Sequence, residues 1–438
     1  MAFKEKINIF WFRRDLRIED NKALFYALKS GHPVLTVFIF DLNILNKLDK
    51  DDKRISAIYQ LLYDLNLALI KKGTSLHFLI GSPIEAFTKL ISEYSINTVY
   101  SNKDYEPYAI HRDKKIHDFL KHNGVKFQLY KDQVIFEENE ILNTEDMPYT
   151  VFTPYMKKWK KQLNKEVLTN YNSTAYFQNF YQKKDHKIPS INETGFNKFY
   201  VVLPDNKINI KVIKNYHKYR DLPVIEGTSR LSIHLRFGTI SIRKLVNIAL
   251  THNEKFLNEL IWREFYMMIL FHFPYVTEEP FKKQFSFIEW DNNEIFFERW
   301  KNGETGIPLV DAGMRQLNKT GFMHNRLRMI TASFLTKNLL IDWRWGEAYF
   351  AKKLLDFELS SNNGGWQWVA GTGTDAVPYF RIFNPVTQAL KYDPGNEYIK
   401  KWIPEINTSA YIKPLVDLKI SREYALSKYK SAIFSFKS

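Results

Sequence analysis

Hydrophobic and polar positions in the first 130 residues alternate between short apolar runs and amphipathic stretches. The apolar runs have the length of buried strands and span Ile7–Phe12, Val34–Phe40, Leu76–Ile80, Thr98–Tyr100 and Lys126–Tyr130. Between them, apolar residues recur at helical spacing near residues 21–30, 53–71, 84–95 and 108–122. Strands that alternate with helices indicate a parallel sheet covered on both faces. Residues 1–130 are therefore predicted to form a doubly wound α/β domain.

The pattern changes after residue 130. Residues 131–205 show little periodicity, and the stretch 170–200 is rich in Asn, Ser, Tyr and Lys, which is typical of a long linker with some helix. Helical periodicity prevails from residue 206 to residue 438. We therefore expect three consecutive segments: an α/β domain, an interdomain linker and an all-helical domain.

Residues 321–385 concentrate aromatic, cationic and glycine residues. Four tryptophans form two close pairs, Trp343 with Trp345 and Trp366 with Trp368. The Asn-Asn-Gly-Gly run at 362–365 is expected to break any helix just before the second pair. Aromatic rings, guanidinium groups and glycines that allow backbone to come close are what a large planar cofactor needs. A tryptophan-rich helical core is the alternative interpretation of the same spacing.

A predicted helix at 256–273 places Glu259, Trp262, Arg263 and Tyr266 on one face, at i, i+3, i+4 and i+7. An acid, a large ring and a cation on one face can hold a base by hydrogen bonding, stacking and a phosphate contact. The alternative is a buried tryptophan beside a surface Glu–Arg pair. Further along the chain, Arg328 is a candidate partner for Asp356.

Residues 224–232 predict a loop that turns into a helix. The hydroxyls of Thr228 and Ser229 precede Arg230, and a helix start with free N–H groups, hydroxyls and a guanidinium suits a phosphate group. An ordinary helix cap accounts for the same residues equally well.

The charge balance favours an anionic partner. The chain carries 63 Lys and Arg against 48 Asp and Glu, a formal net charge of +15. Nucleic acid is the first candidate and an anionic membrane surface the second, while a lysine-rich surface kept for solubility is the alternative. No apolar run reaches about 18 residues and the N-terminus lacks the pattern of a secretory signal. We therefore expect a soluble, cytoplasmic protein without a membrane partner.

Several kinds of chemistry are excluded by composition. The chain has no cysteine, so disulfides, iron–sulfur clusters, thiolate zinc sites and a cysteine nucleophile are ruled out. The eleven histidines show no HExxH spacing, so no metal site is expected. The first strand is not followed by GxGxxG, so ordinary dinucleotide binding at that turn is not supported.

Six segments in this order resemble the photolyase/cryptochrome flavoproteins along essentially the whole chain. They are IFWFRRDLRIEDN at 9–21, EGTSRLS at 226–232, ELIWREFY at 259–266, TGIPLVDAGMRQL at 305–317, NRLRMITASFLTKNLLIDWR at 325–344 and NNGGWQWVAGTGTDAVPYFRIFNP at 362–385. The closest resemblance is to the class I branch, which repairs cyclobutane pyrimidine dimers. Asn325 and Met329 stand where the (6-4) branch has a histidine pair, and Asn362 stands where plant-type cryptochromes carry an acid.

The resemblance implies a helical domain that binds FAD in a U shape and a monomeric carbon–carbon lyase acting on UV-damaged DNA. By motif position, the FAD contacts would be Tyr216, Thr228, Ser229, Arg230, Leu231, Ser232, Arg328, Asp356, Phe357, Glu358 and Asn362. The residues around the damaged bases would be Glu259, Trp262, Asn325, Met329 and Trp368. An electron-transfer chain to the flavin would comprise Trp290, Trp343 and Trp366. The DNA contacts would be Arg220, Arg263, Arg326 and Gln388.

In the mechanism that the resemblance implies, light-excited reduced FAD donates one electron to the dimer, the cyclobutane ring splits, and the electron returns. Phe322 stands where many relatives have Trp, and Phe357 where a Gly is common. Tyr108 and Ala109 stand where folate binding would need a polar and an acidic residue. A second chromophore therefore stays open between folate, deazaflavin, flavin and none. The alternative functions are a blue-light photoreceptor of cryptochrome type, a (6-4) photolyase, and a nucleic-acid-binding module without chemistry.

Overall fold

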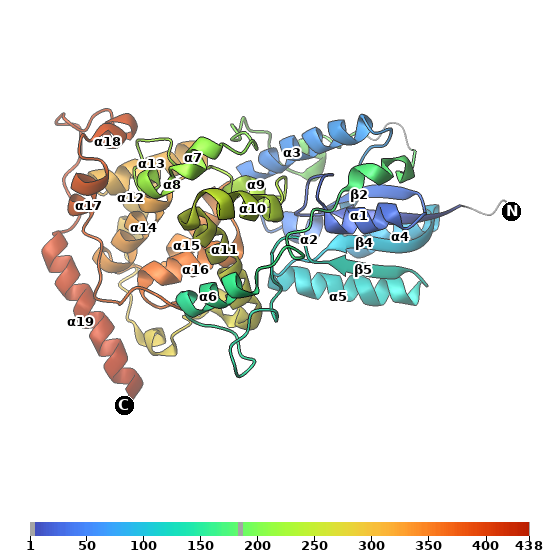
Figure 1. The fold of residues 1–438 in the computed structure, drawn as a ribbon. Helices are drawn as coiled ribbons and strands as arrows, with labels where there is room; N and C mark the ends of the chain where they lie inside the picture. The colour runs from blue at the N-terminus through green and yellow to red at the C-terminus, as the bar shows by residue number, and fades with distance from the viewer. Residues whose placement is uncertain (1–4, 183–186, 438) are drawn as a thin grey trace. The chain divides into compact units, whose positions relative to one another are not determined.

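The computed structural model describes residues 5–182 and 187–437. It divides the chain into two compact units that interleave along the sequence (Figure 1). The first unit takes the described chain up to Glu140 together with residues 162–207 and 230–251, and the second takes residues 141–161, 208–229 and 252 onward. The three consecutive segments expected from the sequence pattern stay a prediction.

The first unit is built on a five-stranded parallel sheet with the order β3-β2-β1-β4-β5. Its strands are β1 (Lys6–Phe12), β2 (Val34–Asp41), β3 (His77–Gly81), β4 (Ser95–Asn102) and β5 (Lys126–Tyr130). All five predicted strands are confirmed, although β4 begins three residues earlier than its apolar run at 98–100. The order, with β1 in the centre, is that of a doubly wound fold.

Helices cover both faces of this sheet because successive side chains of a strand point to opposite sides. Phe10 and Phe12 of β1 pack with α1 (Lys22–Lys29) and α3 (Lys53–Ile70), whereas Ile9 and Trp11 pack with α4 (Pro83–Glu93) and α5 (Pro107–His122). The shorter elements of the unit are α2 (Leu42–Leu45), η1 (Ser173–Asn179), η2 (Ile191–Thr194), α9 (Ser232–Arg236) and α10 (Ile242–His252).

The second unit is helical. Its long helices are α6 (Phe152–Gln162), α11 (Glu254–His272), α12 (Glu294–Asn302), α13 (Pro308–Thr320), α14 (Asn325–Ser333), α15 (Trp343–Lys353), α16 (Leu359–Ala370), α17 (Pro385–Tyr392) and α19 (Leu418–Lys437). Shorter segments are α7 (Ile210–Lys214), α8 (Tyr216–Tyr219), η3 (Pro274–Thr277), η4 (Lys283–Phe287), the π-helical η5 (Phe334–Asn338) and α18 (Glu397–Trp402). The predicted fold class, an α/β domain with a helical remainder, is confirmed.

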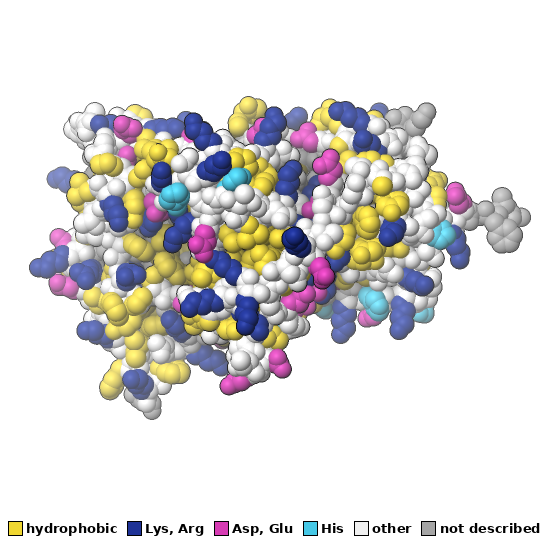
Figure 2. Space-filling view, in the orientation of Figure 1, with side chains coloured by type: hydrophobic (Ala, Val, Ile, Leu, Met, Phe, Trp, Pro, Cys, Tyr) yellow, Lys and Arg dark blue, Asp and Glu magenta, His cyan; other side chains and the backbone are white. Residues whose placement is uncertain are grey.

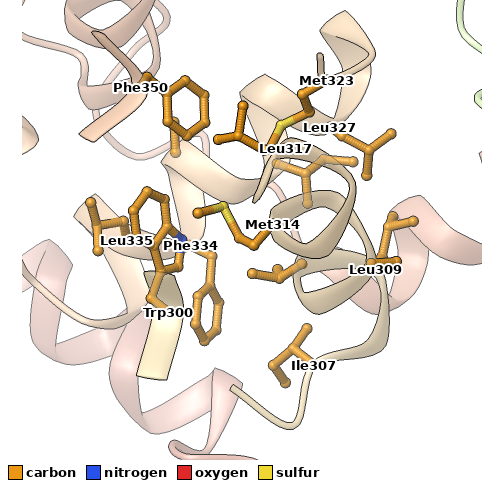
Figure 3. Packing of buried hydrophobic residues seen from close by; sticks show 14 of the residues in the cluster. Trp300, Ile307, Leu309, Met314, Leu317, Met323, Leu327, Phe334, Leu335 and Phe350 are labelled. Carbon is orange, nitrogen blue, oxygen red and sulfur yellow. The ribbon is translucent and has the colours of Figure 1, made fainter. Parts of the chain in front are cut away.

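The largest buried cluster of the second unit surrounds Trp300, which is fully buried. Figure 3 shows Met314 pointing toward the Trp300 ring, with Phe334 and Leu335 close by. The indole N–H of Trp300 donates to the carbonyl of Thr331 at 3.1 Å, so its one polar group is satisfied in the core. No helix among the residues the structure describes is both long and apolar enough to cross a bilayer.

The expected helix break at the glycine run is wrong. α16 continues without interruption through Gly364 and Gly365 and ends only at Gly371, which has a φ of 84°. The reason is tertiary packing. A Cβ at Gly364 would lie 2.7 Å from Cγ of Tyr266 and closer still to two other ring atoms. The glycine therefore lets α16 approach α11, and this packing outweighs the cost of about 1 kcal/mol that glycine brings to a helix interior.

Candidate functional site

The polar stripe on α11 is present, but its ion pairs differ from the simplest expectation. Glu259 pairs with Arg220, the residue after α8, rather than with Arg263 on its own helix. Arg263 donates from Nη2 to Oε1 of Glu358 at 3.2 Å, which joins α11 to the start of α16. Burial alone would lower the pKa of Arg220, yet the neighbouring Glu259 carboxylate raises that pKa above its ordinary value.

Arg326 on α14 is also held by neighbours. Its Nη2 lies 2.6 Å from Oδ1 of Asp221, and its guanidinium lies 4.4 Å from the ring centroid of Tyr392 on α17. Gln388, one turn earlier on α17, has a buried Oε1 without a hydrogen-bond partner in the described part of the chain. Arg220, Arg263 and Arg326 are therefore each held in place by a carboxylate.

The predicted pairing of Arg328 with Asp356 is confirmed. Nη2 of Arg328 lies 2.8 and 3.1 Å from the two carboxylate oxygens, and its Nε donates to the carbonyl of Met323 at 2.9 Å. On the same helix, Nδ2 of Asn325 lies 3.9 Å from the sulfur of Met329. Asn325 is exposed and Met329 half-buried, so both side chains present surface to a ligand.

Asn362 has a partner that the sequence reasoning missed. Its Nδ2 donates to both Oε1 and the backbone oxygen of Glu347, each at 3.1 Å. Burial raises the pKa of Glu347 to about 7, against the hydrogen bond from Asn362, which lowers it. Because Glu347 takes the amide N–H groups, the amide oxygen of Asn362 is left to accept a hydrogen bond from a ligand. No spacing rule links these residues, since they lie on different helices.

The tryptophans divide by exposure. Trp343 and Trp366 are 1% and 3% exposed within one cluster, and the partly buried Trp290 packs against it. The ring of Trp366 also meets Trp300, missed by the sequence reasoning, edge-on at 6.1 Å between centroids. Trp262 and Trp368 are half-buried, as contact with a ligand requires. The electron-transfer role of Trp290, Trp343 and Trp366 stays a prediction.

The segment expected to hold the diphosphate has two unusual backbone features. A Cβ on Gly227 would lie 2.5 Å from Cβ of Tyr219, so only glycine fits this close approach. Arg230 has a φ of 52°, a left-handed conformation that costs energy for a residue with a side chain. The helix that follows, α9, has only five residues. The two units divide between Ser229 and Arg230, so the grouping of Thr228 and Ser229 with Arg230, Leu231 and Ser232 stays a prediction.

Tyr216 packs against α11 within the second unit. Its ring meets Phe256 edge-on at 5.3 Å, and the Arg220 guanidinium lies 5.1 Å from its centroid. Burial, reinforced by the charge of Glu259, raises the pKa of Tyr216 above its ordinary value. Tyr216 therefore stays a neutral hydrogen-bonding group.

Three positions on α16 have an unpaired polar atom or open space beside them. Ser360 has a buried hydroxyl without a hydrogen-bond partner among residues 5–182 and 187–437. A Cβ on Gly365 would meet nothing within 4 Å, so open space adjoins the helix there. Asn362, with its free amide oxygen, lies about one turn before Gly365 on the same side of α16, whereas Ser360 lies on the opposite side. In the described residues, no group of His, Asp and Glu side chains could hold a metal ion.

The first unit gives no support to the folate site. The hydroxyl of Tyr108 lies 2.5 Å from Oδ2 of Asp41, and the Arg112 guanidinium lies 5.8 Å from the Tyr108 ring and 5.0 Å from the Trp11 ring. Ala109 is buried. The polar groups of these side chains are engaged in contacts with one another, so the identity of any second chromophore stays open.

Comparison with known families identifies the chain. A family model described as DNA photolyase matches residues 8–172, and one described as the FAD binding domain of DNA photolyase matches residues 256–410. The chain belongs to the DNA photolyase family. It is 37% identical to the deoxyribodipyrimidine photo-lyase of Alkalihalophilus pseudofirmus, over 93% of this chain and 89% of that protein. It is 35% identical to the one from Escherichia coli, over 97% of this chain and 98% of that protein.

Solved structures agree with this assignment. A class III photolyase from Agrobacterium tumefaciens superposes with a TM-score of 0.87 at 31% identity, covering 99% of this chain and 98% of that one. An archaeal photolyase from Sulfolobus tokodaii, described with two FAD molecules, gives 0.83 at 33% identity, covering 97% and 99%. A cryptochrome from Synechocystis gives 0.84 at 25% identity, covering 98% and 100%. The predicted photolyase membership, enzyme class and FAD-binding domain are confirmed.

Proposed function

We propose that this photolyase repairs cyclobutane pyrimidine dimers in double-stranded DNA. The observation that supports it best is on α11, where the half-buried Trp262 shares a helix face with Glu259. The Glu259 carboxylate is held by Arg220, which follows α8. An apolar ring beside a fixed hydrogen-bond acceptor is what a flipped pyrimidine pair requires. The names of the relatives from A. pseudofirmus and E. coli point to the same substrate.

DNA binding would rest on phosphate contacts from a basic surface. Figure 2 shows Lys and Arg side chains spread over the visible face rather than gathered in one patch. Arg220, Arg263 and Arg326 are the contacts we propose, and Gln388 would add amide N–H donors. Because Asp221 already orients Arg326, a phosphate would bind a preformed guanidinium at little entropic cost. Such contacts fix position on the duplex without reading sequence.

The damaged dinucleotide would leave the duplex and enter the pocket, which costs little because a dimer is already poorly stacked and paired. Trp262 and Trp368 would contact it through largely apolar surface, since the dimer bases have lost aromaticity at the joined carbons. Asn325 and Met329 would complete the wall. Paired with Arg220, the Glu259 carboxylate would accept a hydrogen bond from a thymine imide N–H.

Bound FAD, in its reduced form and excited by light, would supply one electron to the dimer and take it back after the ring splits. The residues of the chain set the conditions for this exchange. Asn362 would present its amide oxygen toward flavin N5, held in that orientation by Glu347. Trp290, Trp343 and Trp366 would carry an electron inward from the surface when the flavin has been oxidised. The monomeric state and a second chromophore remain predictions.

A second candidate function is blue-light reception. The likeness to the Synechocystis cryptochrome supports it, because the same helical architecture serves proteins of both names. A (6-4) photolyase is less well supported, since Asn325 and Met329 stand at the positions of the histidine pair.

The deciding experiment mixes reduced protein with an oligonucleotide that carries one cyclobutane thymine dimer. The mixture is illuminated with blue light, and intact thymines are followed by chromatography, with a dark sample as the control. Light-dependent recovery of thymines is the expected result. No recovery by protein that contains reducible flavin would refute dimer repair, and the (6-4) lesion and then photoreception would be tested in its place.

A further inference from the structure

One face of α6 packs on α11, although the sequence places α6 inside an expected linker. Phe152, Tyr155 and Trp159 fall at i, i+3 and i+7 of α6, and all three are buried. At the far end, Nε1 of Trp159 donates to Oε1 of the buried Glu264 at 2.6 Å. A buried carboxylate that loses its donor is costly, so this hydrogen bond fixes the position of α6 against α11.

At the near end, Phe152 stacks on Trp262. The two ring planes differ by 8° and their centroids lie 3.7 Å apart. The backbone N–H of Phe152 donates to Oδ2 of Asp375 at 3.2 Å, and the hydroxyl of Thr374 donates to the carbonyl of Thr150. Phe152 is thus held by its helix on one side and by the segment after α16 on the other.

The other ring neighbours of Trp262 do not stack flat on its indole. Phe265 meets the indole edge-on at 5.6 Å with an interplanar angle of 84°, and Tyr266 lies tilted against it at 5.4 Å. Trp262 as a whole is still half-buried rather than buried. Because one of its faces is covered by Phe152, a planar ligand can stack only on the opposite face.

We propose that Phe152 is a positioning residue that fixes the plane of Trp262 and covers one of its faces, so that the damaged bases are received on the other face alone. This inference rests on the proposed function, in which Trp262 contacts the flipped dimer. A ring whose orientation is set before binding loses little freedom when the substrate arrives. Without a flat partner, the indole would turn about its side-chain bonds and part of the binding free energy would be spent on ordering it.

Three variants separate positioning from general stability. Phe152→Leu keeps apolar volume but removes the flat partner, and Phe152→Tyr restores the ring. Tyr155→Leu is the control for loosening of α6 as a whole, because it removes from the same face a ring that meets Phe265, with ring centroids 5.2 Å apart, and a hydroxyl bonded to Glu264, rather than the partner of Trp262. Flavin content and thermal unfolding of each holoprotein report whether the fold survives.

The first measurement follows Trp262 itself, without substrate. The ten tryptophans are labelled with 5-fluorotryptophan, and the Trp262 resonance is assigned by its loss in Trp262→Phe. We expect a single sharp fluorine resonance in the parent and in Phe152→Tyr, and a broadened or split one in Phe152→Leu. An unchanged resonance in Phe152→Leu would overturn the proposal, whatever the substrate proves to be.

The second measurement is the affinity ratio between a duplex with one thymine dimer and the same undamaged duplex, in the dark at fixed salt. Phe152→Leu is expected to lower this ratio roughly two- to tenfold, the equilibrium equivalent of one aromatic pair. Undamaged duplex should bind as before, and Tyr155→Leu should keep the parent ratio. A ratio unchanged in Phe152→Leu would refute a role in receiving the dimer. A parent without preference for the dimer would refute the proposed function, while the fluorine spectrum would still decide whether Phe152 positions Trp262.

Discussion

Gly364 and Gly365 are neighbours in α16, yet a methyl group at each would meet different surroundings. A Cβ on Gly364 would overlap the Tyr266 ring, 2.7 Å from Cγ, whereas a Cβ on Gly365 would meet nothing within 4 Å. The Tyr266 ring cannot easily move away, because it lies against Phe265 at 5.8 Å and Trp262 at 5.4 Å. Gly364→Ala is therefore expected to destabilise the protein relative to Gly365→Ala.

The magnitude follows from two terms. Both substitutions gain helix propensity of about 1 kcal/mol, because alanine replaces glycine within a helix. Gly364→Ala alone adds the cost of overpacking, about 1–3 kcal/mol. The propensity gain cancels between the variants, so the free energy of unfolding of Gly364→Ala should be lower than that of Gly365→Ala by about 1–3 kcal/mol.

The assay is urea unfolding of both variants and the parent, each freed of FAD because Asn362, one turn before Gly365, is proposed to face the flavin, and it is followed by tryptophan fluorescence at one protein concentration. The difference between the variants isolates the steric term. Equal stabilities would show that the close approach of α16 to Tyr266 is not why glycine stands at 364. The explanation given for the unbroken helix would then fail.

Four further outcomes can be checked. Burial raises the pKa of Glu347 to about 7, so the folded protein binds the carboxyl proton more tightly than the unfolded chain does. The stability that this proton brings is present at low pH and is lost as the pH rises through about 7. Above that pH, the free energy of unfolding of Glu347→Gln in urea should exceed that of the parent by up to about 3 kcal/mol. Trp343→Phe should block photoreduction of oxidised FAD, measured by absorption, yet spare repair by chemically reduced protein, and normal photoreduction would rule out the electron-transfer role. Glu259→Ala should retain FAD but lower the repair yield, and full repair would contradict its contact with the dimer. Asp132→Asn removes the charge of a buried carboxylate that lies 2.8 Å from Nη2 of Arg243, and should lower the free energy of unfolding by about 3–5 kcal/mol, measured by thermal unfolding. Burial raises the pKa of Asp132, but its arginine partners lower that pKa by more, so it lies below the ordinary value. The parent should therefore lose part of this stability on acidification.

The sheet could be predicted because its information is local. The central strands β1 and β2 are nearly continuous apolar runs, and the helices between the strands show plain amphipathic spacing. The helix through residues 359–370 could not be predicted in the same way. Glycine weakens a helix wherever local propensity decides, and only the three-dimensional contact with Tyr266 shows why it is tolerated at 364.

The candidate site follows the same division. Pairing of Arg328 with Asp356 could be anticipated, since a charged pair near a motif is a simple hypothesis, and the structure confirms it. Two other contacts could not be anticipated, because each joins separate helices: Phe152 stacks on Trp262, and Glu347 accepts from Asn362. An aromatic residue in an expected linker carries no signal of its partner 110 positions later, so only the folded chain reveals it.

The hydrogen bond between Trp159 and Glu264 also bears on how the chain folds as it is made. The two residues are 105 positions apart, and residues 162–207 and 230–251 of the other unit are translated between them. At synthesis rates of about 5–20 residues per second, α6 waits roughly 5–20 s for α11 to leave the ribosome. During that interval its apolar face has no partner helix to cover it. A fragment that starts after residue 207 would lack α6 altogether, so Glu264 would lose its indole donor and Trp262 its stacking partner. The helical unit is thus not a module that can be excised as one continuous piece.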